Sequence, residues 1–244
     1  METVADDVPA LEFSGVRKAY GARRVLDGID LRVHSGSLFG LVGINGAGKT
    51  TLIKSMLDFQ ALDEGVIRVF GEDHRQPRAR RHLAFLPERF SPPHYLRGAD
   101  FLRYMAQLHE VRQDEEEVAG LLARLDLEPA ALDLSVRRFS KGMTQKLGLM
   151  GCLLSGRRLL VLDEPMSGLD PKARARVKGL LRDLCKAGRT VFLTTHLLHD
   201  VDALCDRFAI LHGGRLVFQG SPRECRACYG TEDLEQAYLK AIGG

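Results

Sequence analysis

The chain has 244 residues, of which 45% are hydrophobic and 27% charged, and its formal net charge is +3. This is the composition of an ordinary globular protein, long enough for one large domain or two small ones. The small charge argues against a dedicated nucleic-acid binder, and no apolar run approaches the roughly 18–20 residues that would span a bilayer.

The N-terminal residues and the cysteines indicate the cellular compartment in which the chain is expected. Residues 1–7, METVADD, are acidic and lack the basic-then-apolar pattern of a signal peptide, so we expect the chain to stay in the cytosol unless a partner holds it elsewhere. Five cysteines, an odd number, favour reduced thiols over a disulfide framework. Cys225 and Cys228 form a lone C-x-x-C, for which plain thiols are favoured over a zinc or redox site.

The chain begins with two strand patterns. Apolar residues alternate over residues 11–16 and again over residues 25–33, with a possible bend at Asp27-Gly28. These segments predict a small antiparallel layer. Tyr20 is expected in a short linker between them, either as a half-buried turn residue or as a flat face for an adenine ring.

A phosphate-binding loop follows. Residues 43–50, GINGAGKT, fit G-x-x-x-x-G-K-[ST], after an apolar strand at residues 38–42 and before a helix that begins near Lys49. The glycines let backbone N–H groups point into one concavity, and the positive end of the helix favours an anion. Lys49 should reach the β- and γ-phosphates and Thr50 should ligate Mg²⁺, whereas the alternative is a plain glycine turn. The residues predicted to contact nucleotide here are Gly43, Asn45, Gly46, Ala47, Gly48, Lys49, Thr50 and Thr51.

The next segment contains strands and a basic cluster. Residues 66–71 and 83–86 have strand patterns, and the second ends at Pro87-Glu88-Arg89. Between them lies a cluster without interleaved aromatics, which favours a solvated helix face over nucleic-acid contact. The cluster consists of Arg75, Arg78, Arg80, Arg81 and His82.

Residues 90–155 have only helical patterns. Ser91-Pro92-Pro93 marks a break, and apolar residues then recur at helical spacing over residues 101–108, 118–125 and 143–154. The second of these helices opens with the acidic run 114–117, and Ser140 can cap the third. We therefore predict an all-helical insertion.

A pair of carboxylates follows the apolar run LLVL at residues 159–162. Four apolar residues predict a buried parallel strand, and ligands bind at the carboxyl ends of such strands. Asp163 suits a Mg²⁺ shell, and Glu164 could orient or deprotonate a water. The alternative is a capped strand end with solvated acids.

The remaining elements continue an α/β pattern. Asp170 can cap a helix that starts with Pro171 and stops near Gly188. A buried strand at residues 190–195 then ends at His196, which is either structural or a γ-phosphate contact.

The C-terminal region reads as a hairpin followed by a tail. Strand patterns at residues 208–211 and 216–218 flank Gly213-Gly214, which predicts a closing hairpin. The tail, residues 221–244, contains one amphipathic helix at residues 234–242 and no recognisable chemistry.

One further segment identifies a family. Residues 139–145, FSKGMTQ, resemble the L-S-G-G-Q signature of the ATP-binding cassette (ABC) transporter ATPases, and the resemblance covers nearly the whole chain. Many NTPases share a P-loop, but this signature between P-loop and acidic strand is specific. Residues 166–170, MSGLD, resemble the D-loop of that family, His196 its switch histidine, and Tyr20 its adenine-stacking aromatic.

The resemblance implies an architecture. The expected fold is an α/β P-loop NTPase with a mostly parallel core sheet, an N-terminal antiparallel β layer and an inserted α-helical subdomain. We expect a single ABC ATPase domain over residues 1–244, with its core at 1–89 and 156–220, the helical subdomain at about 90–155 and a C-terminal tail at 221–244.

It also implies a mechanism. Each ATP would lie between the P-loop of one subunit and Ser140 and Gly142 of the other in a head-to-tail dimer. The two subunits could be identical or different. Glu164 would be the general base, His196 would hold the γ-phosphate with Lys49, and Asp170 would couple the two sites. Expected cofactors are ATP and Mg²⁺.

The implied partner is a separate transmembrane permease, whose coupling helix the helical subdomain would grip near Glu88. The ATPase would then lie on the cytoplasmic face of the membrane. No nucleic-acid partner is expected.

Three residues depart from the family pattern. Lys141 replaces a signature glycine, Met143 stands in place of Gln, and Glu88 stands where most members have Gln. A carboxylate near the γ-phosphate is repelled unless Mg²⁺ or Arg89 compensates, so we hypothesise that Glu88 ligates the Mg²⁺ or its water, as do Thr50 and Asp163. Similar cassettes are common among ATPase subunits of bacterial exporters, which favours export.

Two alternatives remain. A soluble ABC ATPase acting on ribosomes or DNA would resemble two cassettes in one chain or carry long coiled coils, and this sequence has neither. An unrelated P-loop kinase or GTPase would leave the signature unexplained.

Overall fold

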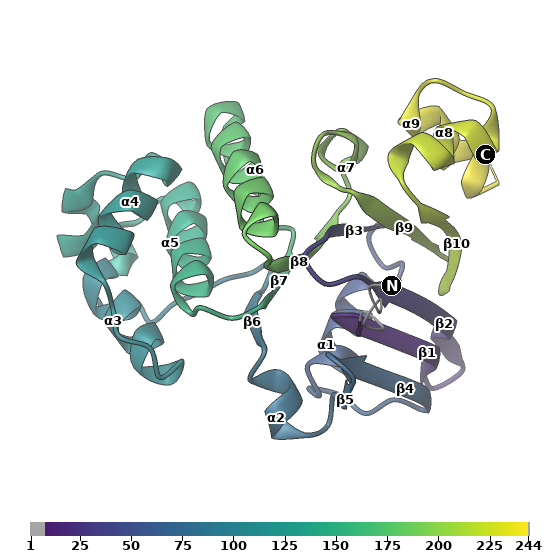
Figure 1. The fold of residues 1–244 in the computed structure, drawn as a ribbon, viewed down its shortest axis with the longest axis horizontal. Helices are drawn as coiled ribbons and strands as arrows, with labels where there is room; N and C mark the ends of the chain where they lie inside the picture. Colours follow the sequence, from purple (N-terminus) through teal and green to yellow (C-terminus); the bar gives the residue numbers. More distant parts are fainter. Residues whose placement is uncertain (1–7, 244) are drawn as a thin grey trace, which may run out of the picture.

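The computed structural model describes residues 8–243, so the acidic run at residues 1–7 lies outside it. A six-stranded sheet in the order β10-β9-β3-β8-β7-β6 runs through the centre of the molecule (Figure 1). Its neighbours pair in parallel from β9 to β6, and β10 pairs antiparallel with β9. The predicted mostly parallel core sheet is confirmed. The strands are β3 (Leu38–Val42), β6 (Leu83–Leu86), β7 (Leu159–Asp163), β8 (Thr190–Thr195), β9 (Arg207–His212) and β10 (Arg215–Gly220).

The N-terminal residues form the predicted antiparallel layer, a sheet in the order β2-β1-β4-β5. Its strands are β1 (Leu11–Tyr20), β2 (Arg23–Val33), β4 (Glu64–Val69) and the short β5 (Glu72–Asp73). Gly28 has a φ of +74° and interrupts the register of β1 and β2 without ending the strand. Tyr20 is the last residue of β1 and pairs with Arg23, so its prediction as a linker residue was wrong. The polar end of this hairpin lacks the apolar alternation by which strands are recognised.

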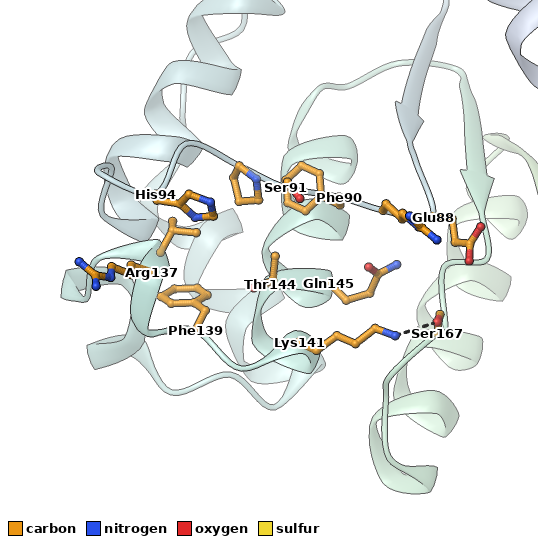
Figure 2. Close-up of a pocket in the computed structure, with 13 residues that line it drawn as sticks. Glu88, Phe90, Ser91, His94, Arg137, Phe139, Lys141, Thr144, Gln145 and Ser167 are labelled. Carbon is orange, nitrogen blue, oxygen red and sulfur yellow. Dashed lines mark hydrogen bonds between the residues drawn. The ribbon is translucent and has the colours of Figure 1, made fainter.

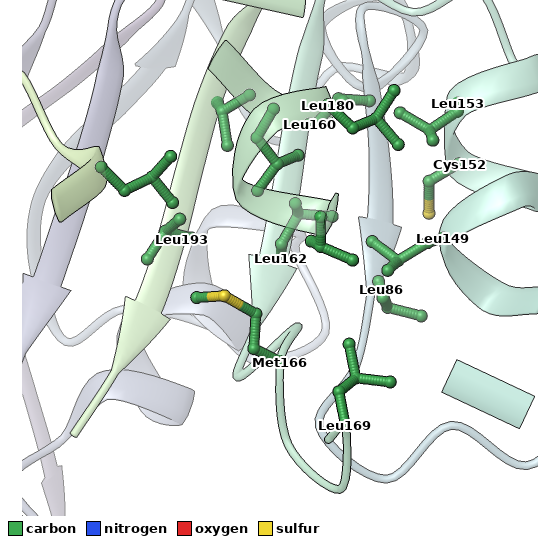
Figure 3. Close-up of a cluster of buried hydrophobic side chains, with 14 of the residues drawn as sticks. Leu86, Leu149, Cys152, Leu153, Leu160, Leu162, Met166, Leu169, Leu180 and Leu193 are labelled. Carbon is green, nitrogen blue, oxygen red and sulfur yellow. The ribbon is translucent and has the colours of Figure 1, made fainter. Parts of the chain in front are cut away.

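The six-stranded sheet is buried on both faces, which explains its apolar strands. Leu38 and Val42 of β3 point into one core cluster, whereas Phe39 and Leu41 point into the other. Strand β7 alternates in the same way, with Leu160 and Leu162 in the first cluster (Figure 3). The first cluster lies under α5 (Lys141–Leu154), α6 (Pro171–Lys186) and α7 (Leu198–Leu204), and the second under α1 (Lys49–Met56) and the antiparallel sheet.

Helices occupy the predicted insertion. Helices α3 (Gly98–Leu108), α4 (Glu115–Leu125) and α5 lie together beyond the β6 edge of the sheet in Figure 1, and two 3-10 turns connect α4 to α5. No named strand occurs within residues 90–155, all of which the structure describes. Asp114 caps α4 by accepting from the Glu116 N–H, and Ser140 caps α5 by accepting from the Met143 N–H. Both caps satisfy backbone donors that the first helical turn leaves free.

The basic cluster is solvated as predicted, with the Arg75 and Arg78 side chains 70% and 66% exposed, but it does not form one helix face. Helix α2 (Pro77–Arg80) is a single turn, too short to have a face. The arginines bind acids instead, since Arg75 pairs with Asp73, Arg78 with Glu72 and Arg80 with Asp58. Glu72 and Asp73 of β5 directly precede the cluster, whereas Asp58 comes from the segment after α1, so only the pair of Arg80 with Asp58 could not be predicted from the sequence around the cluster.

The tail contains two helices, α8 (Pro222–Tyr229) and α9 (Leu234–Ala241), so the prediction of one was incomplete. Helix α8 has only eight residues, but its N-terminal signals were present in the sequence. Ser221 and Glu224 form a reciprocal capping box, and Pro222 occupies the first helical position. Among residues 8–243, no helix combines the length and apolar character needed to cross a membrane.

Candidate functional site

The glycine loop joins β3 to α1 in the predicted strand–loop–helix order. Gly46 and Gly48 have φ values of +84° and +115°, which L-residues rarely adopt. A Cβ on Gly48 would lie 2.9 Å from the Val25 carbonyl oxygen, and one on Gly43 would lie 2.5 Å from that of Leu211. The loop therefore needs glycine both for its turn and for close contact with the strands behind it.

Lys49 is almost buried, with 7% of its surface exposed, and its Nζ donates to the Gly43 carbonyl oxygen at 2.5 Å. The ammonium thus lies within the curve of the loop. A phosphate at this position would receive the loop N–H groups, the positive end of α1 and the ammonium together.

The loop, the acidic strand end and Tyr20 meet around one pocket of about 340 Å³, a volume typical of small-ligand sites. Arg23, Val25 and Ile44 also line this pocket, and sequence reasoning missed them. Arg23 reaches it because it follows the tight turn after Tyr20, and its guanidinium lies over Gly46. The predicted residues that line the pocket are Tyr20, Asn45, Gly46, Gly48, Lys49, Thr50, Thr51, Glu88, Asp163 and Glu164.

Asp163 and Glu164 both bind Thr194 on the neighbouring strand β8. The Thr194 hydroxyl donates to Asp163 Oδ1 at 2.5 Å and accepts from the Glu164 N–H at 3.0 Å. Glu164 has a φ of +50°, a strained conformation for a residue other than glycine. Thr194 thereby fixes the two acids, and a polar residue within an apolar strand was the signal that could have identified it.

Burial changes the protonation equilibria in the pocket. It raises the pKa of Asp163 and of Glu164, while the hydrogen bonds from Thr194 and His196 respectively oppose that rise. Burial also lowers the pKa of Lys49, against the attraction of Glu164, Asp163 and Glu88. Glu88 thus acts electrostatically on both Lys49 and Asp163. Three acids against two cations, Lys49 and Arg23, leave the pocket with an excess of negative charge, so a polyanion fits best when a metal cation accompanies it.

The oxygen groups of this pocket fit Mg²⁺. Thr50, Asp163 and Glu88 line the same pocket, and the Thr50 side chain lies close enough to Asp163 to oppose the rise in its pKa. Residues 8–243 contain no group of three or more His, Cys, Asp or Glu side chains able to hold an ion by themselves. Mg²⁺ is ordinarily held by one or two carboxylates together with substrate phosphates and water, which agrees with this sparse set.

His196 follows β8 and approaches the same acids. Its Nδ1 lies 2.9 Å from Oε1 of Glu164, and 55% of the His196 side chain is exposed whereas only 10% of Glu164 is. His196 and Glu164 also border a second pocket of about 160 Å³ beside the loop that follows Glu164. A partly exposed imidazole thus touches a nearly buried carboxylate at the pocket mouth.

Ser140 and Gly142 lie elsewhere. They occupy the start of α5 and do not line the P-loop pocket. Within this chain, the predicted nucleotide residues therefore fall into two separate groups.

Comparison with known proteins decides the family. The sequence model described as "ABC transporter" matches residues 26–167. The chain is 35% identical over 236 residues to the daunorubicin resistance ATP-binding protein DrrA3 of Streptomyces coeruleorubidus, an alignment that covers 95% of this chain and 74% of that protein. The chain belongs to the ABC transporter family. As an ABC ATPase it binds ATP.

Other relatives and structures agree. The chain is 38% identical over 219 residues to the Nod factor export ATP-binding protein I of Sinorhizobium fredii, covering 87% of this chain and 63% of that protein. A solved ATP-binding subunit of an ABC transporter is 30% identical with a TM-score of 0.86, covering 95% of this chain and 99% of that one. A bacterial Atm1-family ABC exporter with ATP bound, 23% identical, has the same fold, with a TM-score of 0.82 over 98% of this chain and 42% of that one.

Proposed function

We propose that this chain is the ATP-hydrolysing, Mg²⁺-dependent subunit that powers an ABC exporter. The single observation that carries this proposal is the pocket in which the P-loop faces Asp163 and Glu164. The exporter assignment is supported by the relatives, which are named for daunorubicin resistance and Nod factor export. The division of residues 1–244 into a core, a helical subdomain and a tail, with the predicted boundaries, belongs to the same proposal.

Each pocket residue has a role in this proposal. The loop N–H groups and Lys49 bind the β- and γ-phosphates, and Tyr20, which is 52% exposed at the rim, stacks on the adenine. When bound, Mg²⁺ neutralises phosphate charge, held by Thr50, Asp163 and Glu88.

Glu164 acts as the general base in this proposal. It takes a proton from the attacking water, and the rise in its pKa caused by burial improves its match to neutral pH. His196 orients Glu164 through Nδ1. Its other ring nitrogen, Nε2, contacts the γ-phosphate.

The ATP site is completed by a second ATPase subunit. Because Ser140 and Gly142 lie outside the P-loop pocket, they serve the ATP of another copy in a head-to-tail dimer. Each bound ATP then joins two subunits, and its hydrolysis releases them. Asp170, the last residue of the D-loop and the N-cap of α6, links the two sites.

The permease docks in a groove of about 860 Å³ between residues 88–94 and the start of α5 (Figure 2). Phe90 and Phe139 provide apolar walls, and His94 and Arg137 lie at one end. A groove of this size accepts a short helix of a membrane subunit. The chain is thereby held on the cytoplasmic face of the membrane. The relatives named for drug resistance and export disfavour the ribosome or DNA alternative.

The test uses Lys49→Ala, with Lys54→Ala on the exposed side of the same helix as control. Lys49→Ala should abolish ATP binding, measured by equilibrium dialysis, and ATP-dependent dimerisation, measured by light scattering. Lys54→Ala should retain both. A dimer that still forms when ATP is added to Lys49→Ala would contradict the proposal. Co-purification with RNA or DNA in place of a membrane protein would support the alternative.

A further inference from the structure

The start of α5 is fastened to the loop of residues 165–170 in the same chain. Gln145, only 4% exposed, donates from Nε2 to the Pro165 carbonyl oxygen at 3.0 Å. One turn earlier, Lys141 Nζ lies 3.3 Å from the Ser167 hydroxyl oxygen, to which it donates. Figure 2 shows Lys141 extending along the groove toward Ser167, with Gln145 beside it. The signature turn and the D-loop are therefore in direct contact before any second copy binds.

Lys141 also covers the loop with its aliphatic stem. A Cβ on Gly168 would lie 2.7 Å from Cδ and 2.8 Å from Cε of Lys141, so the stem lies directly on the bare glycine. Gly168 has a φ of +75° and no side chain of its own with which to pack. A glycine at position 141, as in the family signature, would provide neither the ammonium nor the stem. The contact between the signature helix and Gly168 thus depends on Lys141, the residue that replaces the signature glycine.

The rest of the loop is anchored by two side chains in the core and by backbone hydrogen bonds. Met166 and Leu169 are 4% and 8% exposed and point into the core cluster (Figure 3). The Ser167 N–H donates to the Glu164 carbonyl oxygen and the Leu169 N–H to that of Met166. Ser167 and Gly168 form the outward part of the loop between these anchors, and Lys141 contacts both of them.

We propose that Lys141 is a positioning residue that fixes the D-loop of its own chain against the signature helix. The two segments then meet the second copy as one preformed surface. This inference rests on the proposed head-to-tail dimer, in which both segments face the partner. A loop that is already ordered loses less conformational entropy on association, so less ATP is needed for the same dimerisation.

The first test is hydrogen exchange of nucleotide-free protein over the peptide of residues 164–170. Lys141→Ala should accelerate exchange of this peptide about two- to tenfold, the range that corresponds to loss of one hydrogen bond. Lys141→Arg should restore the wild-type rate because it retains the cation and a long stem. Lys146→Ala is the matched control, since Lys146 lies on the same helix and binds the Asp126 carbonyl oxygen instead.

The second test is the ATP concentration that gives half-maximal hydrolysis. Lys141→Ala should raise this concentration severalfold and lower kcat by a smaller factor, with Lys141→Arg close to wild type. Unchanged exchange of residues 164–170 in Lys141→Ala would overturn the proposal, and a loss of kcat with unchanged exchange would instead assign Lys141 to the nucleotide. If the wild-type protein does not hydrolyse ATP, the proposed function fails, while the exchange experiment still decides the role of Lys141.

Discussion

Removal of the Asp200 carboxylate should destabilise the protein by about 3 kcal/mol. Asp200 lies on α7, four residues after His196, and its side chain is 4% exposed. Its Oδ2 lies 2.5 Å from Arg174 Nη2 and its Oδ1 lies 2.7 Å from Lys178 Nζ, both on α6. This carboxylate therefore joins the helix that follows the D-loop to the helix that follows the switch histidine.

The magnitude follows from burial. Breaking a buried ion pair by removing one partner costs about 3–5 kcal/mol, because the remaining charge is left without compensation. The side chains of Arg174 and Lys178 are 28% and 13% exposed, so each can partly turn to water, which places Asp200→Ala at the lower end. A loss of about 3 kcal/mol lowers Tm by about 6–12 °C in a chain of this size.

Asp202→Ala is the control, because Asp202 is on the same helix and pairs with Arg226 while 46% exposed. An exposed pair contributes about 0–1 kcal/mol, so its Tm should fall by no more than about 4 °C. Thermal unfolding followed by circular dichroism measures both variants. If Asp200→Ala unfolds within 2 °C of Asp202→Ala, the buried triad does not hold these helices together and the reasoning is refuted.

Three further predictions concern the pocket and the thiols. Wild-type protein should hydrolyse ATP, and Glu88→Gln should raise the Mg²⁺ concentration needed for half-maximal turnover, because it removes a carboxylate proposed to hold the ion. An inactive wild type that this substitution rescues would show instead that Glu88 is inhibitory. Arg23→Ala should weaken ATP binding about three- to tenfold through loss of a cation at the pocket, whereas Arg24→Ala should not, because Arg24 pairs with Asp27; equal affinities for both variants would remove Arg23 from the site. Maleimide at neutral pH should modify exposed Cys228 but not buried Cys152, whose thiol pKa burial raises to about 12; mass spectrometry that finds Cys152 labelled in native protein would contradict the structure.

The chemistry-bearing segments were predictable because their signals are local. The P-loop is one continuous motif, and its flanking strand and helix have clear apolar patterns. The same holds for Asp163 and Glu164, which end an apolar strand, and for the caps at Ser140 and Asp170. In each case, the residues that make the feature are neighbours in the sequence.

Features that depend on distant residues were missed. Thr194 fixes Asp163 and Glu164 from a strand 31 residues away, and only the pairing of β7 with β8 brings them together. Arg23 reaches the pocket because the first hairpin turns directly after Tyr20. The contact between Lys141 and Ser167 spans 26 residues and follows from packing of α5 on the loop.

Glu164→Gln tests the central claim, which is that a pocket shared by two copies hydrolyses ATP with Glu164 as the base. The substitution removes the carboxylate that accepts the proton and keeps an oxygen that can accept from His196. Phosphate release and molecular mass by light scattering should be measured together in Mg²⁺ and ATP. The variant should release no phosphate above background and should accumulate as an ATP-bound dimer. Hydrolysis at the wild-type rate, or a variant that remains monomeric with ATP bound, would contradict the account.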